Sequence, residues 1–226
     1  MRTVSTIAPS TAAPADSPKP KDKIVKTQAS TLLCKSLLLA GMALICGSAT
    51  AEGDVEAGAE LGYTCLGCHG IDGYRNAYPS FRVPKLGGQK SEYLDAALRA
   101  YRAGTRPHPT MQAQASAMSD EDIDNLVAWL ATFGEAADMI DGDSVAGIQV
   151  ATICVTCHGA DGAAVVPAPP VLSGQHADYL VHSLQQYKSG ARGGNVMTAF
   201  ATTLSEADMK LLAEIYAAED GLSTLE

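Results

Sequence analysis

Two short motifs in this chain combine cysteine and histidine at a spacing that can attach an iron-containing group. The first runs CLGCH at Cys65–His69, and the second runs CVTCH at Cys154–His158. Two thiols three positions apart on a helical turn can bond to the two vinyl groups on one edge of a porphyrin. The histidine that follows can then direct its imidazole at the iron. The motifs therefore predict two covalently attached c-type haems. The candidate attachment residues are Cys65, Cys68, His69, Cys154, Cys157 and His158.

Other chemistries also use paired cysteines. A thioredoxin-like redox pair is expected to follow a strand and does not require the histidine. A zinc site can use four cysteines, but the two pairs here are 89 residues apart. Structural disulfides are a further alternative in an oxidising compartment. Two complete motifs favour haem over each of these alternatives.

The two motifs belong to an internal repeat. The cysteine motif recurs after 89 residues, whereas Pro84–Gln89 recurs as Pro170–Gln175 after 86. A single length difference of three residues, between each histidine and its proline, accounts for both values. Two copies predict two similar domains rather than a solenoid. Further pairs at the shift of 86 are Tyr93 and Tyr179, Gly104 and Gly190, Met111 and Met197, and Ser119 and Ser205.

A haem iron held by one histidine needs a ligand on its other side. Met111 and Met197 occupy equivalent positions, and we expect each to lie in a loop that follows a Gly-x-Arg sequence. A neutral thioether there favours the ferrous state and raises the potential. His108 is a rival ligand in the first copy, without a counterpart in the second. The unmatched methionines are interpreted as core residues. They are Met118, Met139 and Met209.

Prolines and arginines near the motifs have two interpretations each. A backbone carbonyl at Pro84 or Pro170 can accept the imidazole N–H and orient the ring, or the residue can be an ordinary loop proline. Arg106 and Arg192 can pair with haem propionates or can be solvated loop residues. Sequence alone leaves both choices open.

Apolar periodicity and helix caps predict an all-helical protein, because no convincing alternating strand run occurs. Ser-x-x-Asp sequences at Ser119 and Ser205 are typical helix starts. The small, polar segment Gly134–Asp143 is interpreted as the linker between the copies. The expected helices are Asp54–Thr64, Ser91–Ala103, Ser119–Phe133, Ser144–Ile153, Ala177–Lys188 and Ser205–Ala218.

The first 51 residues resemble a targeting segment. A long, lysine-containing polar stretch precedes the apolar run Leu37–Cys46 and the small residues Ser48–Ala51. This order predicts a secretory signal peptide and a periplasmic protein, since the run is shorter than the roughly 20 residues of a membrane span. An uncleaved anchor, with peripheral membrane association, stays open. We expect domain 1 at 52–137 and domain 2 at 138–226.

Composition narrows the class of protein. The net charge of −9 argues against nucleic-acid binding, and 46% hydrophobic residues argue against disorder. Aromatic residues make up only 5%, and domains of about 90 residues are near the lower limit for an independent core. Cleavage after Ala51 would leave 10 basic and 23 acidic residues, a net charge of −13. Because the domains are small and contain few aromatic residues, we expect the predicted haems to supply part of each core.

With these motifs the chain resembles the class I cytochromes c, and specifically the dihaem cytochromes c4, over essentially the whole exported part. The resemblance implies two tandem all-α domains, each with a few helices around a covalent haem. It implies the axial pairs His69 with Met111 and His158 with Met197. It also implies that the carbonyls of Pro84 and Pro170 hold the proximal imidazoles.

The resemblance further implies a packing contact between a glycine on the first helix and an aromatic residue on the last. Gly58 and Trp129 fit this pattern in the first copy. In the second copy Gly147 fits, but Ile215 stands at the aromatic position and the ring is found at Tyr216. We therefore expect the local packing of the second copy to differ.

The resemblance implies an electron-transfer protein rather than an enzyme. The favoured expectation is a one-electron carrier of a respiratory chain, between a quinol-oxidising complex or dehydrogenase and a terminal oxidase. The acidic surface predicts partners with basic docking patches. An alternative is the electron-accepting subunit of a periplasmic dehydrogenase that oxidises sulfide or thiosulfate. A dihaem peroxidase needs an open iron position, which two matched methionines argue against.

Overall fold

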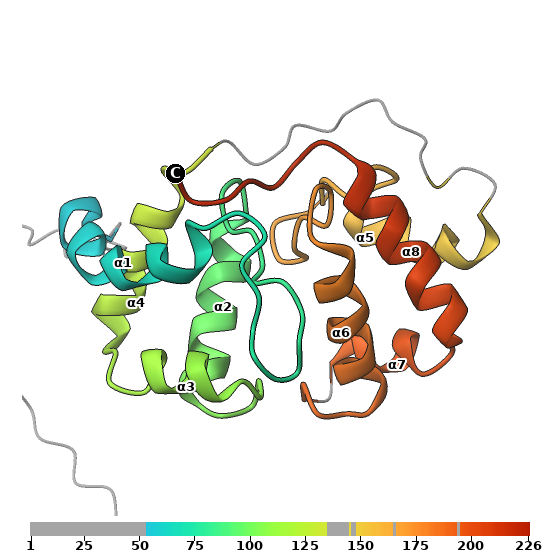
Figure 1. The fold of residues 1–226 in the computed structure, drawn as a ribbon, viewed down its shortest axis with the longest axis horizontal. Helices are drawn as coiled ribbons and strands as arrows, with labels where there is room; N and C mark the ends of the chain where they lie inside the picture. Colours follow the sequence, from blue (N-terminus) through green and yellow to red (C-terminus); the bar gives the residue numbers. More distant parts are fainter. Residues whose placement is uncertain (1–52, 135–144, 146–147, 165, 194) are drawn as a thin grey trace, which may run out of the picture. The chain divides into compact units, whose positions relative to one another are not determined.

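The computed structural model describes residues 53–134, 145, 148–164, 166–193 and 195–226 (Figure 1). Across these residues the secondary structure is helical, and the only β pairings are two isolated bridges. The all-α expectation is confirmed. The first copy contains α1 (Val55–His69), α2 (Ser91–Arg102), α3 (Pro109–Ala115) and α4 (Asp120–Leu130). The second contains η1 (Gln149–Ala151), α5 (Thr152–His158), α6 (Ala177–Lys188), α7 (Val196–Ala201) and α8 (Glu206–Ala218).

Four expectations concern residues outside these ranges. The predicted signal peptide lies there, as do Met139 and Gly147, and so does most of the predicted linker. Of the helices that the structure describes, none combines the length and the apolar character that a membrane crossing requires.

The last helix of each copy begins at a reciprocal cap. Ser119 accepts a hydrogen bond from the backbone N–H of Asp122, and the Asp122 carboxylate accepts one from the backbone N–H of Ser119. Ser205 and Asp208 repeat this arrangement at α8. Both predicted helix starts are confirmed, because a capping box needs only residues that are neighbours in sequence.

Helix α1 is longer than expected and crosses α4 at a pair of glycines. It begins after the Asp54 cap and continues to His69, so the whole first motif is helical. A Cβ atom at Gly58 would lie 2.8 Å from the Cβ of Trp129, and one at Gly62 only 2.0 Å from the indole ring. Only glycine permits this close approach. The predicted contact between Gly58 and Trp129 is confirmed.

The second copy reaches its motif through a shorter helix. A helix was expected over Ser144–Ile153, but the described part of this segment contains only the single turn η1, and α5 starts at Thr152. The Tyr216 ring packs instead on Gly162, where a Cβ atom would lie 2.7 Å from Cδ1 of the ring. The glycine–aromatic contact of the second copy thus involves the loop after the motif. This difference in packing was expected from the ring at Tyr216.

Each copy has its own apolar core, and the C-terminal segment contributes to the first one. Leu225 is 2% exposed and packs among residues of α2 and α4. Its backbone N–H donates to the carbonyl of His69 at 3.0 Å. Of the unmatched methionines, Met209 is buried in the second core and Met118 packs against the first, as interpreted. The first core contains Leu94, Leu98, Ile123, Leu126, Val127, Trp129 and Leu130; the second contains Leu180, Leu204, Met209, Leu212, Ala213 and Tyr216.

Candidate functional site

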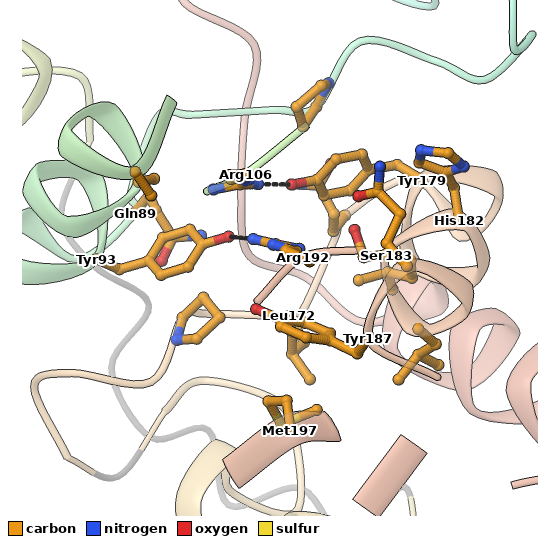
Figure 2. Close-up of a pocket in the computed structure, with 18 of the residues that line it drawn as sticks. Gln89, Tyr93, Arg106, Leu172, Tyr179, His182, Ser183, Tyr187, Arg192 and Met197 are labelled. Carbon is orange, nitrogen blue, oxygen red and sulfur yellow. Dashed lines mark hydrogen bonds between the residues drawn. The ribbon is translucent and has the colours of Figure 1, made fainter. Parts of the chain in front are cut away.

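Both cysteine motifs open onto one cavity of about 980 Å³. The cavity is lined mainly by apolar side chains of α2, α6 and the loops that lead to α3 and α7, and Figure 2 shows part of its wall. All ten predicted site residues lie around it. They are Cys65, Cys68, His69, Pro84, Met111, Cys154, Cys157, His158, Pro170 and Met197.

None of the four motif cysteines forms a disulfide bond within the described residues. Burial raises the pKa of Cys65 and of Cys154, which keeps these thiols protonated near neutral pH. The structure thus contains no disulfide at either motif, and the pKa shifts of Cys65 and Cys154 are opposite in direction to that of an activated thiolate. Within the described ranges no group of three His, Cys, Asp or Glu side chains is arranged to hold a metal ion, so the zinc alternative also lacks a site.

The two motif histidines are oriented by backbone carbonyls. Nδ1 of His69 donates to the carbonyl of Pro84 at 2.7 Å, and Nδ1 of His158 donates to that of Pro170 at 3.0 Å. Because a carbonyl only accepts, the proton is on Nδ1 and the lone pair of Nε2 is free for a metal. Burial lowers the pKa of both rings although these hydrogen bonds oppose it, so both are neutral at pH 7. The carbonyl interpretation of the two prolines is confirmed.

The two methionines lie in short helices, not in the loops that were expected. Met111 is in α3 and Met197 is in α7. A side chain at each helix start accepts from the methionine backbone N–H: Nδ1 of His108 at 3.2 Å and Oδ1 of Asn195 at 2.9 Å. Helices of seven and six residues are too short to show an apolar period, and histidine is not a usual cap.

This cap defines what His108 can do. Its Nδ1 lone pair accepts the Met111 N–H, so the proton of the neutral ring is on Nε2. In this arrangement His108 caps the helix that contains Met111. His108 is a positioning residue for the chain around Met111, and Asn195 does the same beside Met197.

Arg106 and Arg192 are buried and bonded across the repeat. Nη2 of Arg106 donates to the Tyr179 hydroxyl, and Nη2 of Arg192 donates to the Tyr93 hydroxyl, both at 2.7 Å (Figure 2). Their exposed fractions are 6% and 8%. The interpretation as solvated loop residues is therefore wrong. Each guanidinium also lies over a ring of its own copy, 4.5 Å from the centroid of Tyr101 or 4.6 Å from that of Tyr187.

These two buried cations both line the cavity. In the part of the chain that the structure describes, neither guanidinium has a carboxylate within ion-pair distance. Burial raises the pKa of the Tyr93 hydroxyl, but Arg106 and Arg192 outweigh it and lower the pKa to about 7. Buried charge normally requires a counter-charge. The wall therefore suits a bound group that carries acid substituents, as haem does.

Sequence reasoning missed the residues that join the copies. Gln89 and Gln175 are buried and bond to the backbone of the opposite copy. Phe81 stacks on His182 with ring centroids 4.2 Å apart. The glutamines were visible as the last residue of a repeated motif, but only the fold shows that their partners are in the other copy.

The comparisons with known proteins agree with this site. The family model "Cytochrome c" matches residues 55–134 and 144–214. Cytochrome c4 of Pseudomonas aeruginosa is 32% identical over 197 residues, which cover 80% of this chain and 95% of that protein. The thiosulfate dehydrogenase electron acceptor of Stutzerimonas stutzeri is 33% identical over 169 residues, which cover 68% of this chain and 77% of that protein. The structure of reduced recombinant cytochrome c4 from Pseudomonas stutzeri matches with a TM-score of 0.60 and 26% identity, over 74% of this chain and 100% of that one.

The chain therefore belongs to the cytochrome c family, as a two-domain member similar to the dihaem cytochromes c4. The residues present fit the cofactor: each copy offers two cysteine thiols outside any disulfide and a neutral histidine with an open Nε2, and both copies face the same largely apolar cavity. The protein carries two covalently attached c-type haems, one at each CxxCH motif, and transfers electrons.

Proposed function

We propose that His69 and Met111 hold the first iron and that His158 and Met197 hold the second. The observation that carries this proposal is repeated in each copy. A histidine with a free Nε2 and a methionine with an anchored backbone line the same cavity. Imidazole and thioether are the axial pair that raises a haem potential into the range of electron carriers.

The side chains around each iron supply orientation and exclude water. The haem, when bound, provides an iron that gains and loses one electron. The Pro84 and Pro170 carbonyls hold the imidazoles in one tautomer, and the caps of α3 and α7 place the methionine backbones. With a histidine and a methionine both bound, each iron would have no open position for peroxide, which supports electron transfer rather than catalysis.

The protein acts in the periplasm, and it exchanges electrons with partners that present basic patches. The predicted signal peptide and the relatives named cytochrome c4 support this assignment. The pathway runs from a quinol-oxidising complex or a dehydrogenase to a terminal oxidase. Exposed charges are screened over about 8–10 Å at physiological salt, so the association rate with a partner should fall as salt rises.

A second candidate function is that of an electron-accepting subunit. Its support is the 33% identity with the thiosulfate dehydrogenase electron acceptor of Stutzerimonas stutzeri. Affinity purification of the tagged chain from its own cells separates the two candidates. A stoichiometric catalytic chain that reduces the haems when thiosulfate is added supports the subunit. Reduction by a quinol-oxidising complex and reoxidation by an oxidase, without such a chain, supports the carrier.

The absorption spectrum of the oxidised protein tests the axial ligands. Methionine ligation gives ferric haem a weak band in the red, and we expect two equivalents of it per chain. Met111→Leu and Met197→Leu should each remove half of the band and leave the other half. If the parent shows one equivalent together with a high-spin signal, one iron is open and the carrier assignment is wrong.

A further inference from the structure

In each copy of the repeat, a glutamine bonds to the backbone N–H and the carbonyl of one residue of the other copy. Gln175, in the second copy, bonds to the backbone of Lys85 in the first. Its Oε1 accepts from the Lys85 N–H at 3.0 Å, and its Nε2 donates to the Lys85 carbonyl, also at 3.0 Å. The Lys85 N–H belongs to the same peptide unit as the Pro84 carbonyl, which accepts from His69.

The reverse contact is also present. Oε1 of Gln89 accepts from the Val171 N–H at 2.9 Å, and its Nε2 donates to the Val171 carbonyl at 3.1 Å. That N–H shares a peptide unit with the Pro170 carbonyl, which accepts from His158. Gln89 and Gln175 are 7% and 3% exposed. The two contacts follow the repeat shift of 86, so each glutamine makes the same two bonds to the equivalent residue of the other copy.

Two hydrogen bonds therefore run in series to each motif histidine. The imidazole N–H donates to a peptide carbonyl, and the N–H of the same peptide donates to a glutamine oxygen of the other copy. Hydrogen bonds in such a chain polarise one another, so a filled N–H end makes the carbonyl a stronger acceptor. A stronger acceptor on Nδ1 raises the basicity of the imidazole toward a metal at Nε2.

We propose that Gln175 tunes the iron ligand His69 and that Gln89 tunes His158, so that each copy adjusts the haem potential of the other. These two glutamines are positioning residues that act through a shared peptide group. The inference rests on the histidine ligands of the proposed function. A more basic imidazole favours the ferric state, so loss of a glutamine should raise the potential of the haem in the opposite copy.

The test compares Gln175→Leu with the mirror variant Gln89→Leu in the full, haem-loaded chain. The first readout is the ¹⁵N shift of Nδ1 in each ligand histidine of the reduced, diamagnetic protein. The second is the potential of each haem, followed through the NMR signals of its own axial methionine. Gln175→Leu should change the ¹⁵N shift of His69 and raise the potential of the first haem. Gln89→Leu should change the ¹⁵N shift of His158 and raise the potential of the second haem.

The expected size follows from a modest change in one hydrogen bond. Partial weakening of one hydrogen bond should change the ratio of reduced to oxidised haem by about twofold. At 59 mV per tenfold change for one electron, this is about 18 mV. Gln175→Glu keeps an acceptor for the Lys85 N–H, so its His69 signal should return to the parental value or pass beyond it.

Several outcomes would overturn the inference. In one, Gln175→Leu leaves the ¹⁵N shift of His69 unchanged. At the same time it changes the potentials of both haems equally, or changes only the potential of the haem in its own copy. If Gln175→Leu does not fold, Gln175→Glu decides, because a His69 signal displaced in the direction of a weaker hydrogen bond contradicts the chain. A parent protein without two methionine-ligated haems would refute the proposed function itself. A normal parent with no cross-copy shift refutes only the role of the glutamines.

Discussion

The two copies present the same histidine to the same kind of carbonyl with different lengths of chain between them. Pro84 follows His69 by 15 positions, whereas Pro170 follows His158 by 12. In the second copy the shorter segment closes through a backbone bond from Ala164 to His158. The hydrogen-bond distances still agree within a few tenths of an ångström. In both copies a glutamine of the opposite copy bonds to the peptide that contains this carbonyl, so that anchor does not depend on the length of the intervening loop.

The longer loop of the first copy has an additional role. It places Phe81 on the ring of His182 in α6, and Asp178 at the start of that helix pairs with Arg75 at 3.1 Å. The backbone N–H of Arg82 also donates to Asp178. The surroundings of the two haems therefore differ although their ligands are equivalent, and two unequal potentials are the expected result.

The copies also differ in what the aromatic residue of the last helix packs on. In the first copy α1 crosses α4 at Gly58 and Gly62 beneath Trp129, whereas in the second copy Tyr216 packs on the loop glycine Gly162. Duplication has thus retained the polar groups that hold the histidines and has altered the apolar contacts that surround them.

Trp129→Ala should cause the largest loss, because it empties the crossing of α1 and α4. Removal of a buried tryptophan costs about 3–5 kcal/mol of unfolding free energy. Ile215, the equivalent residue in the second copy, is only partly buried. Ile215→Ala should therefore cost clearly less. Chemical denaturation of both variants measures the difference, and equal costs would show that the two crossings are alike.

Leu225→Ala tests the contribution of the C-terminal segment to the first core. The side chain is almost fully buried there, and a leucine truncation of this kind costs about 2–5 kcal/mol. The loss of stability should appear as faster amide hydrogen exchange in α2 and α4. Glu226→Ala, at the exposed neighbouring residue, is the matched control and should change nothing. Increased exchange confined to α6 and α8 would contradict the assignment of Leu225 to the first copy.

Tyr179→Phe and Tyr93→Phe probe the crossed arginine pairs. Each removes one hydrogen bond to a buried guanidinium, and bonds to charged groups are worth about 1.5–3 kcal/mol. Because the pairs are related by the repeat, the two losses should be similar. Each variant is then combined with a leucine substitution of its partner arginine, which completes a double-mutant cycle. A coupling energy near zero would show that these pairs do not stabilise the contact between the copies.

Tyr216→Phe should have the smallest effect and the opposite sign. The Tyr216 hydroxyl is buried and has no hydrogen-bond partner among the described residues. Burial of an unpaired hydroxyl is unfavourable, so its removal should leave stability unchanged or raise it slightly. Thermal unfolding beside the parent measures this. A loss above about 1 kcal/mol would mean that the hydroxyl has a partner in the haem-loaded protein.

The features that could be predicted from sequence are those that depend on near neighbours. The CxxCH motifs, the caps at Ser119 and Ser205 and the repeat itself are all of this kind. Helices α3 and α7 are too short to leave a periodic signal. The partners of Gln89 and Arg192 are 82 and 99 residues away, and no pattern around either residue identifies them. The repeat shows that such residues occupy equivalent positions in the two copies. It does not show that each one bonds to the opposite copy.

The most direct test of the central claim is a count of axial methionines by proton NMR of the reduced protein. A methionine bound to low-spin ferrous haem gives a methyl signal shifted far upfield by the ring current. We predict two such signals, one lost in Met111→Leu and the other in Met197→Leu, while His108→Ala retains both. A single signal in the parent, or the loss of one in His108→Ala with a change to histidine-type ligation, would contradict the account.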